Sequence, residues 1–176
     1  QCVFVRNVVD VSTITVTSAG GAAVLLKLSA SADVRIRRTN FVENAILYQL
    51  PPHPKRMVLR GGALFIEHSS RVDGGLRLQL VDVVATRNAI AHAANADVEL
   101  SGGFAFVSSS LARVTIDRLV ATGNRVRAAG EDVIAPQAGS ELYGAALRVE
   151  LGANSSLAIA DSVVAGSVTA AAFFNT

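Results

Sequence analysis

The sequence of 176 residues contains no tryptophan, one cysteine, one methionine and four prolines. Because an internal disulfide needs two cysteines, Cys2 cannot form one within the chain. We expect Cys2 to be a small buried hydrophobic residue, with a bond to a partner chain or to an upstream part of the chain as the alternative. Charged residues are also scarce, at 17%, whereas hydrophobic residues reach 51%. This balance excludes a disordered chain, which needs low hydrophobicity and a high net charge.

The charges give no sign of a nucleic-acid partner. Sixteen basic and fourteen acidic residues leave a net charge of +2, and the basic residues are scattered rather than clustered. A nucleic-acid-binding protein would gather lysine and arginine on one face. The most apolar run, 157–174, has the length of a membrane helix, but the repeat described next accounts for it as strands. We therefore expect no direct membrane span.

A repeat of 41 residues organises the chain. Gly21, Gly62, Gly103 and Gly144 are each 41 residues apart, and each precedes a short apolar segment. Between these glycines an aliphatic residue is followed, eight positions later, by a polar one. The pairs are Ile36 and Asn44, Leu80 and Asn88, Ile116 and Asn124, and Ile159 and Ser167. Each aliphatic residue ends a short run of alternating apolar and polar residues, which is typical of a half-buried strand.

These units predict an all-β fold. A unit of this size cannot bury its own apolar face, but a stack of such units can. Because stacked identical strands run parallel and their crossovers are right-handed, we predict a right-handed parallel β-helix of four to five coils with about three strands in each unit. Residues 1–176 would form a single segment of a longer chain or assembly. We expect two interior columns: Ile36, Leu80, Ile116 and Ile159 in one, and Val24, Phe65, Phe106 and Leu147 in the other.

One unit carries two family motifs. The stretch from Asn40 to Ala45, with Phe41 and Asn44, and the later run from Gly61 to Leu64 resemble the FxxN and GGA[ILV] repeats of chlamydial polymorphic membrane proteins. Similar repeats occur in other surface proteins with a pectin-lyase-like β-helix. The resemblance implies a secreted or surface-exposed β-helix, often adhesive or structural.

Two columns are interpreted as structural. Asn44, Asn88 and Asn124 would stack at one tight turn, where asparagine tolerates left-handed backbone and its amides can form a ladder. The glycines at 21, 62, 103 and 144 would allow positive φ and close approach between coils. No Gly-Lys-Ser/Thr sequence follows them, so they do not form a phosphate loop.

An outward polar strip is the candidate ligand site. The position two residues after each core aliphatic residue holds, in chain order, Asn7, Arg38, Asp82, Arg118 and Asp161. We interpret the strip as a surface ion-pair ladder. The alternative is a carbohydrate-binding or acid/base strip, although the two carboxylates would be two coils apart, with an arginine between them, which makes a poor catalytic pair.

Histidine gives no metal or catalytic signature. His53, His68 and His92 do not share the spacing of metal ligands, and the single cysteine is remote. We expect solvated loop residues, no cofactor, no metal and no catalytic residue.

Three segments would form a lateral wall on the stack, and they are the place where function would sit. They run from Leu47 to Arg60, from Ala91 to Ser101 and from Arg127 to Tyr143. Asn154-Ser155-Ser156 is the one complete N-glycosylation sequence. Neither end shows a charged cap, so we expect both ends to continue or to dock onto partner chains.

The predicted function is therefore a non-enzymatic structural or interaction segment of a secreted or cell-surface protein. Its partners would be other protein chains or flanking segments. The alternatives are a carbohydrate-cleaving β-helix, a lyase or glycoside hydrolase, and an adhesin that binds glycan without cleaving it.

Overall fold

The structure is a computed structural model that describes residues 1–10, 18–48, 57–69, 75–92, 98–128 and 141–171. These residues are all-β, and every strand pairing among them is parallel. The predicted all-β class with parallel pairing is confirmed. Within the described part of the chain, no helix has the length and apolar character that a membrane crossing requires.

The strands form four sheets, which we call A to D. Sheet A contains β1 (Cys2–Val5), β5 (Ala32–Val42), β9 (Leu76–Thr86), β13 (Ala112–Thr122), β17 (Ser156–Ala160) and β18 (Val163–Ala165). Sheet B contains β2 (Val8–Asp10), β6 (Ala45–Tyr48), β10 (Ala89–His92), β14 (Arg125–Ala128) and β19 (Val168–Ala171). Sheet C contains β3 (Ser18–Gly20), β7 (Met57–Arg60), β11 (Val98–Ser101) and β15 (Glu141–Tyr143). Sheet D contains β4 (Val24–Leu28), β8 (Leu64–His68), β12 (Ala105–Ser109) and β16 (Leu147–Leu151).

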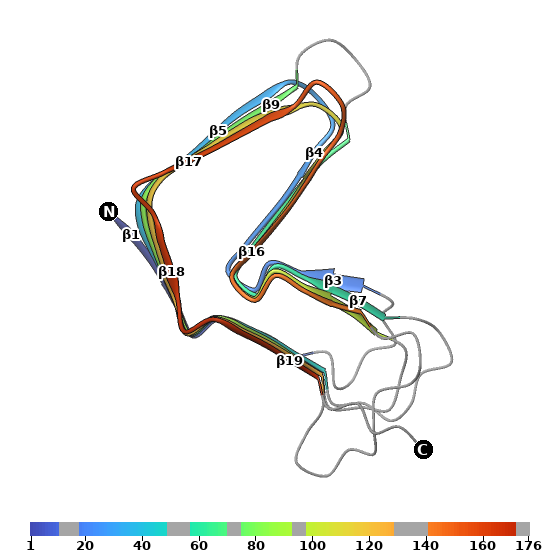
Figure 1. Cartoon of the computed structure of the whole chain (residues 1–176). Helices are drawn as coiled ribbons and strands as arrows, with labels where there is room; N and C mark the ends of the chain where they lie inside the picture. The colour runs from blue at the N-terminus through green and yellow to red at the C-terminus, as the bar shows by residue number, and fades with distance from the viewer. Residues whose placement is uncertain (11–17, 49–56, 70–74, 93–97, 129–140, 172–176) are drawn as a thin grey trace.

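Each of the first four repeats contributes one strand to each sheet, which is four strands rather than the three that the sequence predicts. The described residues from 156 onwards add β17 and β18 to sheet A and β19 to sheet B. In sheet A the order is β1-β5-β9-β13-β17, and the other sheets follow the same succession of repeats. Figure 1 looks along the stack, so that strands from blue to red overlie one another.

The two predicted interior columns have different outcomes. Ile36, Leu80, Ile116 and Ile159 are register partners across sheet A, as predicted. In sheet D the column is instead Val24, Leu64, Ala105 and Leu147. Phe65 and Phe106 lie one residue further on, opposite Leu25 and Arg148. The prediction failed here because equivalent residues are not equally spaced: a fixed step of 41 shifts the alignment by one residue.

The apolar residues form two clusters. The larger cluster joins the inward residues of sheets A and D, including the fully buried Leu80 and Phe104. The smaller one joins sheets B and C through residues such as Ile46, Leu59 and Leu100. Full burial of each such large side chain contributes about 1.5–3 kcal/mol. Because every inward residue packs on its equivalent in the next repeat, the middle strands have the best-covered side chains.

The chain turns at three columns of left-handed backbone. The first column holds Arg38, Asp82, Arg118 and Asp161, with φ between 45° and 55°. The second holds Arg6, Glu43, Arg87, Gly123 and Gly166, and the third holds Gly21, Gly61, Gly102 and Gly144. A single residue with left-handed backbone changes the direction of the chain, so each column bends the repeats at the same place.

The third column corrects the predicted set of glycines. Gly21 and Gly144 belong to it, but Gly62 and Gly103 lie one residue beyond the bend. A Cβ atom on Gly62 would meet the carbonyl oxygen of Gly103 at 2.1 Å. That position therefore needs glycine because the repeats approach closely there.

Candidate functional site

The outward strip predicted from the sequence exists as a column at the first bend. Asp82 lies opposite Arg38 on one side and Arg118 on the other, because their flanking residues are register partners. Asn7 does not belong to it: since Val5 pairs with Val42, Asn7 lies opposite Asn44. The left-handed backbone at each strip position holds the four side chains at one corner.

Two of the four strip residues, Asp82 and Arg118, form an ion pair. Arg118 Nε lies 2.6 Å from Asp82 Oδ1, and Arg118 also pairs with Asp117. The hydrogen bond from Arg118 lowers the pKa of the Asp82 carboxyl below its usual value. A carboxyl held in its ionised form in this way is a weak proton donor, so Asp82 is better suited to pairing than to general-acid chemistry.

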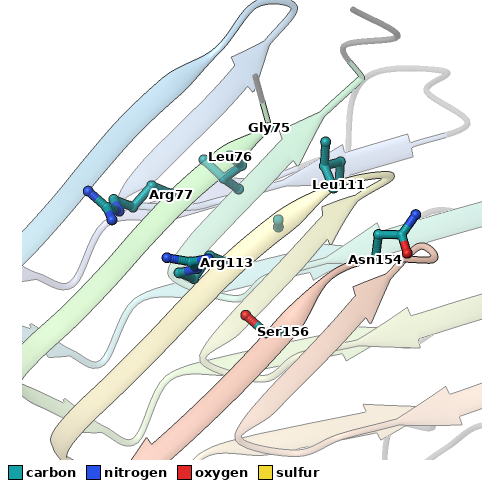
Figure 2. Close-up of a pocket in the computed structure, with 8 residues that line it drawn as sticks. Gly75, Leu76, Arg77, Leu111, Arg113, Asn154 and Ser156 are labelled. Atoms are coloured by element: carbon teal, nitrogen blue, oxygen red, sulfur yellow. The ribbon is translucent and has the colours of Figure 1, made fainter. Parts of the chain in front are cut away.

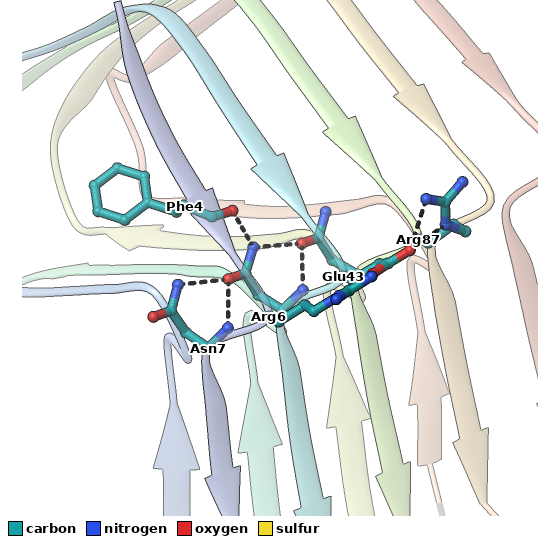
Figure 3. Close-up of polar contacts among 7 residues, drawn as sticks. Phe4, Arg6, Asn7, Glu43 and Arg87 are labelled. Atoms are coloured by element: carbon teal, nitrogen blue, oxygen red, sulfur yellow. Dashed lines mark hydrogen bonds and ion pairs between the residues drawn. The ribbon is translucent and has the colours of Figure 1, made fainter.

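A second ladder of charges lies at the next bend, and sequence reasoning missed it. Glu43 Oε2 accepts a hydrogen bond from Arg6 Nε at 2.8 Å, and Glu43 Oε1 accepts one from Arg87 Nη2 at 2.6 Å. Both bonds lower the pKa of the Glu43 carboxyl. Figure 3 shows the three side chains in line on the outer side of the bend.

The predicted asparagine column lies directly behind this ladder. The side-chain Nδ2 groups of Asn7, Asn44 and Asn88 each donate to the Oδ1 atom of the next rung, at 2.8, 2.9 and 3.0 Å. The same Oδ1 atoms accept the backbone N–H of the preceding rung. Asn44, Asn88 and Asn124 are fully buried. The sequence analysis expected left-handed backbone at the asparagine itself. The structure instead has it at the residue before each asparagine.

Asn7 is a rung that the sequence analysis missed. The signal was present, because Phe4 and Asn7 have the same spacing as Phe41 and Asn44, and the two phenyl rings stack with centroids 5.1 Å apart. At the other end Ser167 follows Asn124 in register, and its buried Oγ has no hydrogen-bond partner in the described structure. The amide ladder therefore ends at Asn124.

Two predicted environments are wrong. His68 is 3% exposed rather than solvated: Nδ1 lies 3.0 Å from Ser109 Oγ, and Nε2 lies 3.1 Å from the carbonyl oxygen of Ala30. Ser109 and Ala30 belong to the repeats on either side, so the ring is held between its two neighbouring repeats. Cys2, expected to be buried, is exposed. His53 and the side chain of His92 lie outside the described residues.

The described residues contain no group of three or more histidine, cysteine, aspartate or glutamate side chains that could hold a metal ion. Much of the predicted lateral wall, at 49–56, 93–97 and 129–140, lies outside the described residues. Asn154 of the glycosylation sequence is exposed in a turn, with φ +64°.

Shallow hollows lie on the outer surface. One, of about 310 Å³, is bounded by Gln1, Arg38, Asn40 and Asp82 beside the strip. A second, of about 260 Å³, lies where the strands of sheet A begin (Figure 2). The sequence analysis predicted neither, because both need residues from several repeats.

No protein-family model, no curated protein and no solved structure matches this chain.

Proposed function

We propose that this chain is a right-handed parallel β-helix segment of four to five coils with a non-enzymatic role. It is a structural and interaction part of a secreted or cell-surface protein. The parallel sheets, the buried amide ladder and the three continuous bends support the β-helix. The polymorphic-membrane-protein resemblance and the exposed Asn154 sequence support the location.

The observation that carries the interaction role is the exposure of core positions in the last strands. Ile159 belongs to the interior column, where Ile116 is 1% exposed, yet Ile159 itself is 56% exposed. Leu157 and Val164 are likewise exposed at 44% and 59%, opposite the buried Val114 and Ala121. A parallel sheet edge with uncovered apolar side chains is a template for further pairing. The contacts of this segment are therefore made at its apolar end, with other protein chains or flanking segments.

The experiment is sedimentation of the chain over a range of concentrations, using a second copy as the partner. We expect concentration-dependent association. In Ile159→Lys the apparent dissociation constant should rise about tenfold or more, because burying one such side chain contributes about 1.5–3 kcal/mol.

Val163→Lys is the matched control. Val163 is 53% exposed on the same edge, but it follows the outward Val120 rather than the interior column. Its association should stay close to that of the unsubstituted chain. A chain that is monomeric at every concentration, or two variants with equal effects, would contradict the proposal.

The carbohydrate-binding or carbohydrate-cleaving alternative stays a prediction. The hollow beside Arg38 and Asp82 has polar groups that a sugar could contact. The pairing of Asp82 with Arg118 works against it, because a ligand would compete with an existing ion pair.

A further inference from the structure

A hollow on the outer face of sheet A collects two arginines from neighbouring repeats. Its volume is about 260 Å³. It is lined by Gly75, Leu76, Arg77, Leu111, Ala112, Arg113, Asn154 and Ser156. Arg77 of β9 and Arg113 of β13 are register partners, and Ser156 of β17 follows Arg113 in the same row. Figure 2 shows the two arginine side chains pointing to the same side of the sheet, with Ser156 on the next strand.

The pairing of these two arginines is unfavourable on its own. Like charges placed directly opposite each other on neighbouring strands destabilise a sheet. Among the residues that the structure describes, no ion pair joins Arg77 or Arg113 to a carboxylate. The row continues to Asp33 opposite Arg77. Both oxygens of Asp33, however, already accept hydrogen bonds from Arg35, at 3.1 and 2.6 Å.

Other arginines of the same sheet have partners. Arg35 binds Asp33, and Arg37 donates to Gln79 Oε1 at 2.7 Å. At the first bend Arg118 binds Asp82. Among the described arginines of sheet A, Arg38, Arg77 and Arg113 form no ion pair, and of these three only Arg77 and Arg113 lie directly opposite each other. An anion between the two guanidinium groups would supply the missing acceptor.

We propose that this hollow binds a tetrahedral oxyanion, a sulfate or phosphate group. Guanidinium groups present forked N–H donors that match such oxygens in pairs. Adjacent strands are about 4.8 Å apart, so that two arginines in one row can reach the same anion. The Ser156 hydroxyl and the Asn154 side-chain amide line the same hollow and can donate to the remaining oxygens.

The oxyanion can be a free ion or a group carried by a larger molecule such as a sulfated oligosaccharide. Because the hollow is open at the surface, either source can reach it. The hollow adjoins the apolar end, because Ser156 belongs to β17, but its two arginines lie on β9 and β13. Sulfate binding and self-association are measured separately, so failure of one proposal leaves the other standing.

The test is a titration of the full chain with sodium sulfate, replacing sodium chloride at constant ionic strength. The side-chain Nε–Hε resonances of arginine are followed by NMR. We expect two of these resonances to shift and saturate. In the double variant Arg77→Gln and Arg113→Gln, affinity should fall about tenfold or more, because two charge-assisted hydrogen-bonding groups are lost. A sulfated oligosaccharide that binds more tightly than free sulfate identifies the carried group as the source, and equal or weaker binding identifies the free ion.

A charge-matched control keeps the proposal falsifiable. The double variant Arg125→Gln and Arg127→Gln removes the same net charge from exposed positions of sheet B. It should bind sulfate as the unsubstituted chain does, and unfolding midpoints of both double variants verify that they fold. Shifts that never saturate, or equal losses in the two double variants, would overturn the site.

Discussion

Two polar ladders run side by side along the second bend, and they differ in burial. Asn44 is fully buried, whereas the side chain of Glu43, the residue before it, remains 31% exposed. Both side chains bond to the repeats on either side. Glu43 accepts hydrogen bonds from both neighbours, whereas Asn44 accepts from one and donates to the other. A buried amide left without a partner loses its hydrogen bonds with no water to replace them, whereas an exposed ion pair is solvated and screened. Stacking therefore determines which residues meet, and burial determines how much each contact stabilises the fold.

Removing a middle rung of the amide ladder should have the largest effect. Asn88→Ala deletes the acceptor of both the backbone N–H and the Nδ2 group of Asn44, and frees the carbonyl oxygen of Phe41. Each buried group left without a partner costs about 1–3 kcal/mol, so that we expect a loss of about 3–5 kcal/mol in the free energy of unfolding. Denaturant unfolding followed by circular dichroism measures it.

The matched control for Asn88 is the same substitution at the exposed end of the ladder. Asn7→Ala removes one side-chain donor to Asn44 Oδ1, while the backbone N–H of residue 7 still donates to that atom. We expect a loss of about 1 kcal/mol. Equal losses of unfolding free energy in the two variants would show that the stabilisation from each rung does not depend on its burial.

Alanine substitutions of two glycines at the bends should separate the cost of left-handed backbone from the cost of steric crowding. Gly123 continues the column of Glu43 and Arg87, and a Cβ atom there would come no closer than 3.4 Å, to Arg87 Cγ. At Gly102, a Cβ atom would lie 2.2 Å from the carbonyl oxygen of Ala105. Gly123→Ala should therefore cost about 1 kcal/mol, from the left-handed backbone alone. Gly102→Ala should cost about 2–3 kcal/mol by the same unfolding measurement, because the clash adds to the strain. Similar losses at both sites would contradict the crowding.

The amide ladder and the class of fold could be predicted from the sequence because they follow from short-range patterns. The alternation that ends at Ile36 and the asparagine eight residues later survive small changes in repeat length. The sheet D column could not be aligned, because the step between Val24 and Leu64 is one residue shorter than the average. Because the connections between strands vary in length, equivalent residues can be aligned only when the register of each sheet is known separately.

The two arginines at 77 and 113 were not predicted for a related reason. Their distances from the repeat glycines Gly62 and Gly103 differ, so an alignment on the glycines does not bring them together. The sheet A column does, because each arginine lies three residues before its aliphatic residue, Leu80 or Ile116. His68 was wrongly expected in solvent because it looks like a loop residue beside two serines. Its environment depends on Ser109 and Ala30, which belong to the neighbouring repeats. Contacts between repeats fix such side chains, and a single repeat gives no sign of them.

The smallest effect should come from the exposed ladder, and its dependence on pH should identify it. Hydrogen bonds from Arg6 and Arg87 lower the pKa of Glu43 below its usual 4.5. A lowered folded-state pKa means that the stabilisation is present above the unfolded-state value and is lost as the pH falls through the folded-state one. Glu43→Gln should therefore lower the unfolding midpoint slightly at neutral pH, and the difference from the unsubstituted chain should shrink below about pH 4.5. Added salt should shrink it as well, because exposed ion pairs are screened.

The amides of Asn88 do not titrate, so the loss in Asn88→Ala should stay nearly constant over the same range. If the lower unfolding midpoint of Glu43→Gln persisted at low pH and in high salt, the exposed ladder would behave like the buried one. Burial would then not explain the difference between them.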